Sequence, residues 1–98
     1  MITSEVTADY LKELKAALHV RHNHDDENLK NLIRRGHVRI QSYCGDFPLD
    51  NELGRDLVYE YVRFVYNNQG EWFYQSYHAE LITLQLSLME FPEVTEDG

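Results

Sequence analysis

The chain has 98 residues, 43% of them hydrophobic, with a formal net charge of −8 and one cysteine. This length supports one domain with one hydrophobic core. A single cysteine excludes an internal disulfide and a cysteine-based zinc site, and fits a reducing compartment such as a bacterial cytosol. No apolar run approaches the ~18 residues of a membrane-spanning helix, so we expect no membrane association. The acidic balance argues against general affinity for nucleic acid, which needs a positive surface.

The chain divides into three parts on its pattern of apolar residues. Residues 1–6 lack periodicity, and we expect a flexible arm that is either unanchored or ordered by a partner. Residues 7–91 contain the helical domain, and residues 92–98 form an acidic tail that we expect to be disordered. Thr7 is a good N-cap for a first helix that runs to about His19. Its apolar stripe consists of Leu11, Leu14 and Leu18.

A long helix is predicted between His24 and Gly45. Acidic residues follow His24, where they interact favourably with the positive end of the helix dipole. Gly45 can adopt the left-handed conformation that commonly follows a last helical turn. Residues three and four apart form an apolar stripe on one face. This stripe contains Leu29, Leu32, Ile33, Gly36, Ile40, Tyr43 and Cys44.

A third helix follows a turn around Pro48. Phe47 and Leu49 flank the proline and can close the core, and Asp50 is the expected cap of a helix that runs to about Asn67. The apolar face of this helix covers about half of its circumference, so we expect it to lie centrally and to contact two neighbours. The face contains Leu53, Leu57, Val58, Tyr61, Val62, Phe64 and Val65.

The C-terminal part has an ambiguous pattern. Residues 71–81 favour a helix. Ile82, Leu84, Leu86 and Leu88 then alternate with polar residues, which favours a strand, whereas Leu81, Leu84 and Leu88 would share one face of a helix. Both alternatives stay open. The predicted fold is mainly α: a small bundle of about four helices, with or without a short C-terminal extended strand.

The residues that most resemble a chemical site form a histidine-rich loop. His22, His24, Asp25 and Asp26 are metal-ligating residue types, but helix capping explains the two acids. His37 and Cys44 are two helical turns apart, too far for a nucleophile–base pair. We predict no catalytic, metal or cofactor site and no enzyme, with a metal-dependent enzyme built on the histidine loop as the weakest alternative.

Charged residues indicate a contact surface instead. The long helix carries a basic cluster, and the third helix carries an acidic side. Complementary surfaces on one chain permit head-to-tail association into rings or filaments. The basic cluster is Lys30, Arg34, Arg35 and Arg39, joined by His37, and the acidic side is Glu52, Asp56 and Glu60. Val38 and the off-stripe Tyr59 and Tyr66 are candidate exposed apolar residues at the same interface.

Several of these features together resemble a known family. Asp-Asp-x-x-Leu-x-x-Leu-Ile (25–33), a small residue at Gly36 and Tyr-Cys-Gly (43–45) follow a short leucine-containing helix. A Tyr-Asn-Asn turn (66–68), an aromatic-rich segment and Leu-Gln-Leu (84–86) come after them. Over residues 7–88, this order of elements resembles the head–tail connector family of tailed bacteriophages, often labelled as DNA-packaging or head-completion proteins. Members of the family often end in Gln-Leu-Arg-Gly, whereas Ser87 and Leu88 follow Gln-Leu in this chain. We therefore do not expect the contact that the arginine makes in the family.

The resemblance implies a structural virion protein without catalytic residues. It would form a ring, usually a dodecamer, beneath the portal, and join the capsid to the tail or its completion proteins. DNA would pass through the ring without sequence-specific binding. The protein would assemble in the host bacterial cytoplasm and end at the head–tail interface. An extended segment with Ile82, Leu84, Leu86 and Leu88 would dock the portal or a neighbouring subunit by strand pairing. The alternative is a small helical regulatory protein that binds a protein or nucleic acid.

Overall fold

Helices account for all regular secondary structure in residues 1–89, the part of the chain that the computed structural model describes. The predicted mainly helical class is confirmed. The predicted tail, 92–98, lies outside the described residues. The elements are α1 (Ala8–Leu18), α2 (Asp26–Cys44), α3 (Glu52–Tyr66), the short 3-10 helix η1 (Gly70–Trp72), α4 (Phe73–Ser76) and α5 (His78–Leu88).

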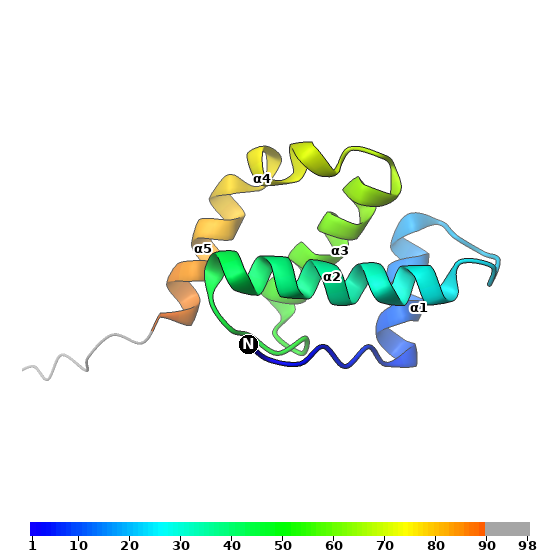
Figure 1. The fold of residues 1–98 in the computed structure, drawn as a ribbon, viewed down its shortest axis with the longest axis horizontal. Coiled ribbons are helices and arrows are strands. Elements are labelled where there is room, and N and C mark those ends of the chain that lie inside the picture. Colours follow the sequence, from blue (N-terminus) through cyan, green and yellow to red (C-terminus); the bar gives the residue numbers. More distant parts are fainter. Residues whose placement is uncertain (90–98) are drawn as a thin grey trace, which may run out of the picture.

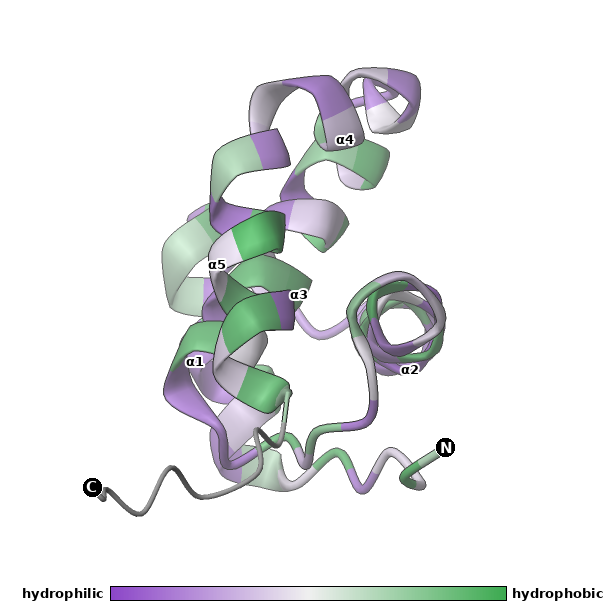
Figure 2. Ribbon diagram, turned by 90° about the vertical axis from the view of Figure 1, so that its left-hand side faces the viewer, coloured by the Kyte–Doolittle hydropathy of each residue, from purple (hydrophilic) through white to green (hydrophobic). Residues whose placement is uncertain are grey.

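The helices pack in two layers. Seen along the axis of α2, that helix lies on one side of the molecule, and α1, α3 and α5 lie on the other (Figure 2). Figure 1 shows α1 near the N-terminal end of α2 and α5 near its C-terminal end. The position of α3 between them agrees with the prediction of a central third helix, because α3 packs against α2, η1, α4 and α5.

The start of α1 follows the local sequence as predicted, whereas both ends of α2 differ from the expectation. The Thr7 side chain caps α1 by accepting a hydrogen bond from the backbone N–H of Tyr10 at 3.2 Å. Asp25 occupies the N-cap of α2 but makes no side-chain capping bond. Gly45 has φ +116° and ψ 165°, an extended conformation with positive φ rather than the left-handed turn that we predicted. This glycine therefore turns the chain out of the helix instead of closing a last turn.

The buried face of α2 matches the predicted stripe except near its end. Tyr43 is half exposed, and its ring packs edge-on against Tyr74 with 5.1 Å between centroids. His37, assigned above to the basic cluster, and Gln41 are also buried. They are buried because the N-terminal arm and the loop around Phe47 cover them.

The N-terminal arm is attached to the bundle, so the prediction of an unanchored segment is wrong. The Ile2 N–H donates to Gln41 Oε1 at 2.9 Å, and Gln41 Nε2 donates to the Ile2 carbonyl oxygen at 2.8 Å. Ser4 Oγ lies 2.6 Å from His37 Nδ1. Buried polar side chains need hydrogen-bond partners, and here the arm supplies them. The spacing of apolar residues cannot predict such polar contacts between distant segments.

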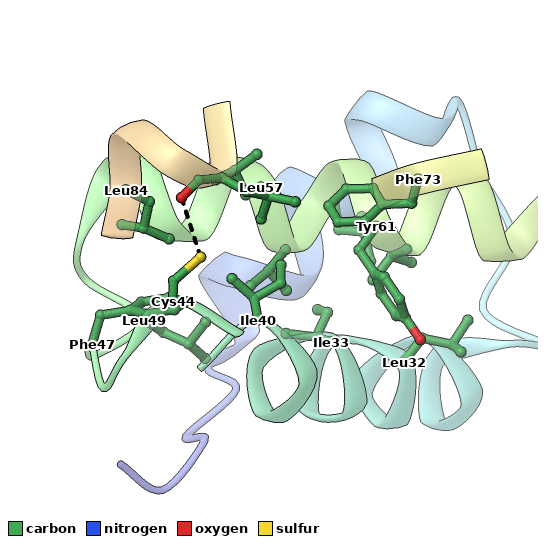
Figure 3. Packing of buried hydrophobic residues seen from close by; sticks show 14 of the residues in the cluster. Leu32, Ile33, Ile40, Cys44, Phe47, Leu49, Leu57, Tyr61, Phe73 and Leu84 are labelled. Atoms are coloured by element: carbon green, nitrogen blue, oxygen red, sulfur yellow. Dashed lines mark hydrogen bonds between the residues drawn. The ribbon is translucent and has the colours of Figure 1, made fainter. Parts of the chain in front are cut away.

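The loop before α3 closes the core as predicted. Phe47 and Leu49 are buried against the helices (Figure 3). The cap of α3 is Asn51, not Asp50, because the Asn51 side chain accepts a hydrogen bond from the Gly54 N–H at 3.0 Å. Both residue types are good caps, and the turn at Pro48 decides which of the two reaches the helix end.

The C-terminal segment is helical, so the strand alternative is wrong. α5 runs to Leu88, with Leu81 and Leu84 in the core and Ile82 and Leu86 exposed. A helix satisfies its own backbone hydrogen bonds, whereas an isolated strand would leave them unpaired. Docking by strand pairing is therefore not supported. The predicted helix over 71–81 is interrupted at Tyr77, which separates α4 from α5.

Candidate subunit interface

The basic residues of α2 form one exposed face. Arg34, Arg35, Val38 and Arg39 are exposed. At about 100° of rotation per residue, these four side chains fall within an arc of about 140° that is centred opposite the buried face. Val38 is 45% exposed at the middle of this arc. We call these four residues the basic face of α2.

Lys30 and His37, also assigned to the basic cluster, lie elsewhere. Lys30 is half-buried, with its Nζ 3.6 Å from a carboxylate oxygen of Glu27. His37 has no exposed surface. Its Nε2 lies 2.6 Å from the Phe47 carbonyl oxygen, which can only accept, so Nε2 carries the proton and Nδ1 accepts from the Ser4 hydroxyl. Burial lowers the pKa of His37, and the bond to Phe47 partly offsets this. His37 is therefore a neutral core residue.

The acidic side of α3 is smaller than predicted. Glu52 and Asp56 are exposed and lie on the side of α3 opposite its buried residues. Glu60 is half-buried and already has partners within the chain. It accepts a hydrogen bond from the Tyr77 hydroxyl at 2.8 Å and forms an ion pair with Arg63 at 3.1 Å. We therefore restrict the acidic face of α3 to Glu52 and Asp56.

The two charged faces point in different directions. α2 and α3 pack against each other, and in Figure 2 they occupy different layers. Each charged face lies about 180° around its helix from the residues that it buries. The basic face of α2 therefore points outward on one side of the molecule, and the acidic face of α3 points outward on another. One copy can thus offer both faces at once to two neighbours.

Two tyrosines proposed as exposed interface residues are tied within the chain. The Tyr59 hydroxyl donates to Glu13 Oε1 at 2.9 Å and contacts the Tyr10 carbonyl oxygen at 3.2 Å. Burial, followed by the bond to Glu13, raises the pKa of Tyr59. The Tyr66 hydroxyl donates to Asp25 Oδ2 at 3.1 Å. These side chains attach α3 to α1 and to the start of α2, and are not available to a partner.

The proposed C-terminal contact residues divide between core and surface. Leu84 is fully buried and cannot contact a partner, and Leu88 is half-buried against the core and exposes only part of its side chain. Ile82 and Leu86 are 41% and 53% exposed. Met89, which the sequence reasoning did not select, is 50% exposed on the same side. Met89 is the C-cap residue that directly follows α5, and its spacing of three from Leu86 places it at the end of the same helical face. Interpreting the segment as a strand hid this relation.

The histidine-rich loop makes mainly structural contacts. The rings of His22 and His24 stack with 4.8 Å between centroids. Asp26 forms an ion pair with Lys15 Nζ at 2.7 Å, and the Asp25 carboxylate accepts the Tyr66 hydroxyl bond described above. Over residues 1–89, no group of three or more His, Cys, Asp or Glu side chains is arranged to hold a metal ion. The two acids stabilise the entry into α2.

Cys44 is a core residue. Its thiol is buried and lies 3.3 Å from the Leu81 carbonyl oxygen, to which it donates (Figure 3). Burial raises the pKa of the Cys44 thiol, which disfavours the nucleophilic thiolate. The sequence-based interpretation of Cys44 as a small core side chain is confirmed.

Comparison of the chain with protein-family models, curated proteins and solved structures finds no match. Among the helices in residues 1–89, none has the length and apolar character that crossing a membrane requires.

Proposed function

We propose that this chain is a subunit of a ring-shaped head–tail connector of a tailed bacteriophage. The observation that carries the proposal is the pair of oppositely charged faces, on α2 and α3, that point away from each other. In a ring, the basic face of one copy would contact the acidic face of the next. A head-to-tail contact of this kind closes when the rotation between copies divides a full turn.

The sequence resemblance supplies the biological context of the proposal. The ring, usually a dodecamer, would bind the portal protein on one side and a tail or head-completion protein on the other. It would assemble in the host cytoplasm and remain in the virion. The net charge of −8 agrees with this role, because an acidic bore repels the phosphates of DNA that must slide through it.

The first experiment measures particle mass. Native mass spectrometry of the protein alone, and then mixed with the portal protein of the same bacteriophage, should reveal a closed oligomer in at least the second sample. A chain that stays monomeric in both samples would contradict the proposal. Salt should weaken the oligomer, because exposed charges are screened within about 10 Å at 0.1 M ionic strength.

Charge reversal then tests the contact itself. Arg35→Glu and Asp56→Lys should each weaken ring formation by roughly tenfold, since exposed ion pairs contribute about 1 kcal/mol and reversal adds repulsion. The two variants combined in one chain should restore much of the loss. Lys12→Glu makes the same charge change at an exposed position of α1 and should leave assembly unchanged. Equal losses in Arg35→Glu and Lys12→Glu, which change the net charge by the same amount, would attribute the effect to net charge alone.

DNA binding distinguishes the regulatory alternative. A helical regulator that binds nucleic acid through α2 would show salt-dependent DNA affinity that is lost in Arg34→Ala and Arg35→Ala. A connector subunit should show no affinity for a short duplex at physiological salt. The same purified proteins can be used for both assays.

A further inference from the structure

α5 carries two separate apolar faces. Leu81 and Leu84 are 2% and 0% exposed and face the core. Ile82, Leu86 and Met89 retain 41%, 53% and 50% of their accessible surface. At about 100° per residue, these three lie within about 60° of one another and about 130° from the buried face. A surface helix normally has one apolar face, so the second is unexplained by the packing of the monomer.

The exposed face has the spacing of a helix–helix seam. Ala79 is also exposed, one turn before Ile82, and the four positions are separated by three, four and three residues. This is the a/d spacing with which one helix packs along another. We call Ala79, Ile82, Leu86 and Met89 the α5 seam. Because α5 lies at one end of the described part of the chain, beside the C-terminal end of α2, another chain can approach it (Figure 1).

Charge is absent from the seam, although the chain as a whole is strongly acidic. Glu80 is the acidic residue of α5 and lies about 140° around the helix from the seam. The exposed residues that border the seam are Thr83 and Gln85, which are uncharged, and His78, so none of the three is acidic. Two copies with a net charge of −8 repel each other over most orientations. An uncharged apolar strip is the surface on which this repulsion is smallest and apolar burial is largest.

We propose that the α5 seam binds the α5 seam of a second copy in antiparallel orientation. In that orientation the small Ala79 lies opposite the long Met89, and Ile82 lies opposite Leu86, which has the same volume, so the contact fills evenly along its length. A parallel pair would oppose two methionines at one end and two alanines at the other, and would leave a gap. The antiparallel contact is self-complementary and closes as a two-fold dimer.

A groove beside the seam extends the contact. It lies between the end of α2 and α5 and is lined by Tyr43, His78, Ile82 and Gln85, among others. Tyr43 is 50% exposed at its edge. Stable dimers bury about 800 Å² on each partner with roughly 20–30 residues a side, whereas the seam and groove supply far fewer. The dimer is therefore weak, in the micromolar to millimolar range.

Salt separates this dimer from the ring proposed above. Association through the charged faces weakens as salt rises, whereas the α5 dimer strengthens, because salt screens the repulsion between two acidic chains. The dimer does not depend on the connector function, since it uses different residues. A failure of one leaves the other testable.

The experiment is sedimentation velocity of the purified full chain from 10 to roughly 500 μM, at about 0.05 and 0.5 M NaCl. We expect a concentration-dependent dimer that is more populated at high salt. Leu86→Glu should weaken it at least tenfold, because two carboxylates would enter an apolar contact. Ser87→Glu makes the same charge gain about 120° around the same helix and should have little effect. Far-UV circular dichroism verifies that both variants remain helical.

Cross-linking tests the orientation. In a Cys44→Ala background, Ala79→Cys and Met89→Cys proteins should form a disulfide dimer when mixed under oxidising conditions, and little when each is alone. A monomer at all concentrations and salts would overturn the proposal, as would equal effects of Leu86→Glu and Ser87→Glu. Cross-linking of Ala79→Cys with itself would overturn the antiparallel arrangement.

Discussion

Replacing Gly36 with alanine would place a methyl group against Tyr61. An alanine Cβ at this position would lie 2.7 Å from Tyr61 Cδ2 and 3.4 Å from Cε2 and Cγ. The first distance is well inside van der Waals contact. Tyr61 is 6% exposed, and its ring packs edge-on against Phe73 with 5.4 Å between centroids. The ring therefore cannot swing away without disturbing the core, and α2 and α3 must separate slightly.

The size of the effect follows from two opposing contributions. Alanine is favoured over glycine in a helix interior by about 1 kcal/mol. Overpacking a well-packed core costs about 1–3 kcal/mol. Gly36→Ala should therefore lower the free energy of unfolding by about 1 kcal/mol. For a domain of this size, that change corresponds to a decrease in Tm of about 4–8 °C.

A double-mutant cycle measured by urea denaturation separates the two contributions. Tyr61→Val removes the ring atom that the new methyl group meets, so Gly36→Ala should stabilise the protein by up to about 1 kcal/mol in that background. Ser42→Ala, at an exposed position of α2, controls for helix propensity and should be neutral or slightly stabilising. Stabilisation by Gly36→Ala in the unaltered protein, or the same effect in both backgrounds, would refute the close approach of α2 and α3.

Three further predictions concern stability. Lowering the pH should reduce the free energy of unfolding, because burial lowers the pKa of His37 in the folded chain, so the unfolded chain binds its proton first. The loss begins as pH falls through about 6.5 and ends below the folded-state pKa, with a slope of at most about 1.4 kcal/mol per pH unit. His37→Gln should remove this part of the pH dependence, and an unchanged profile would contradict it. Asn51→Ala should cost about 1 kcal/mol in urea denaturation and Asp50→Ala much less; the reverse order would assign the cap to Asp50. Leu84→Ala should cost about 2–5 kcal/mol and Leu86→Ala within about 0.5 kcal/mol at low protein concentration. Similar costs would argue against the helical register of α5.

Local sequence signals were sufficient to place α1 and the buried side of α2. Thr7 caps α1 as predicted, and the stripe from Leu29 to Cys44 identifies the buried side of α2. These features depend on contacts within one or two turns of a helix. Residue spacing and cap preferences can predict such local contacts. The basic and acidic residues could also be assigned to particular helices, although their partners within the chain could not. Glu60 is an example, because Tyr77, which binds it, comes from another element.

Polar contacts between distant segments required the tertiary structure. His37 and Gln41 have residue types typical of a surface, and only the arm and the loop at Phe47, folded across them, make their burial favourable. The pattern of α5 was compatible with both a strand and a helix. The contact of Leu81 and Leu84 with the core decided for the helix, and thereby moved Ile82 and Leu86 to the surface. The sequence by itself determined which segments are amphipathic, because that is a local property. The tertiary structure decided which polar groups are buried and which apolar groups remain exposed, because burial depends on what the rest of the chain covers.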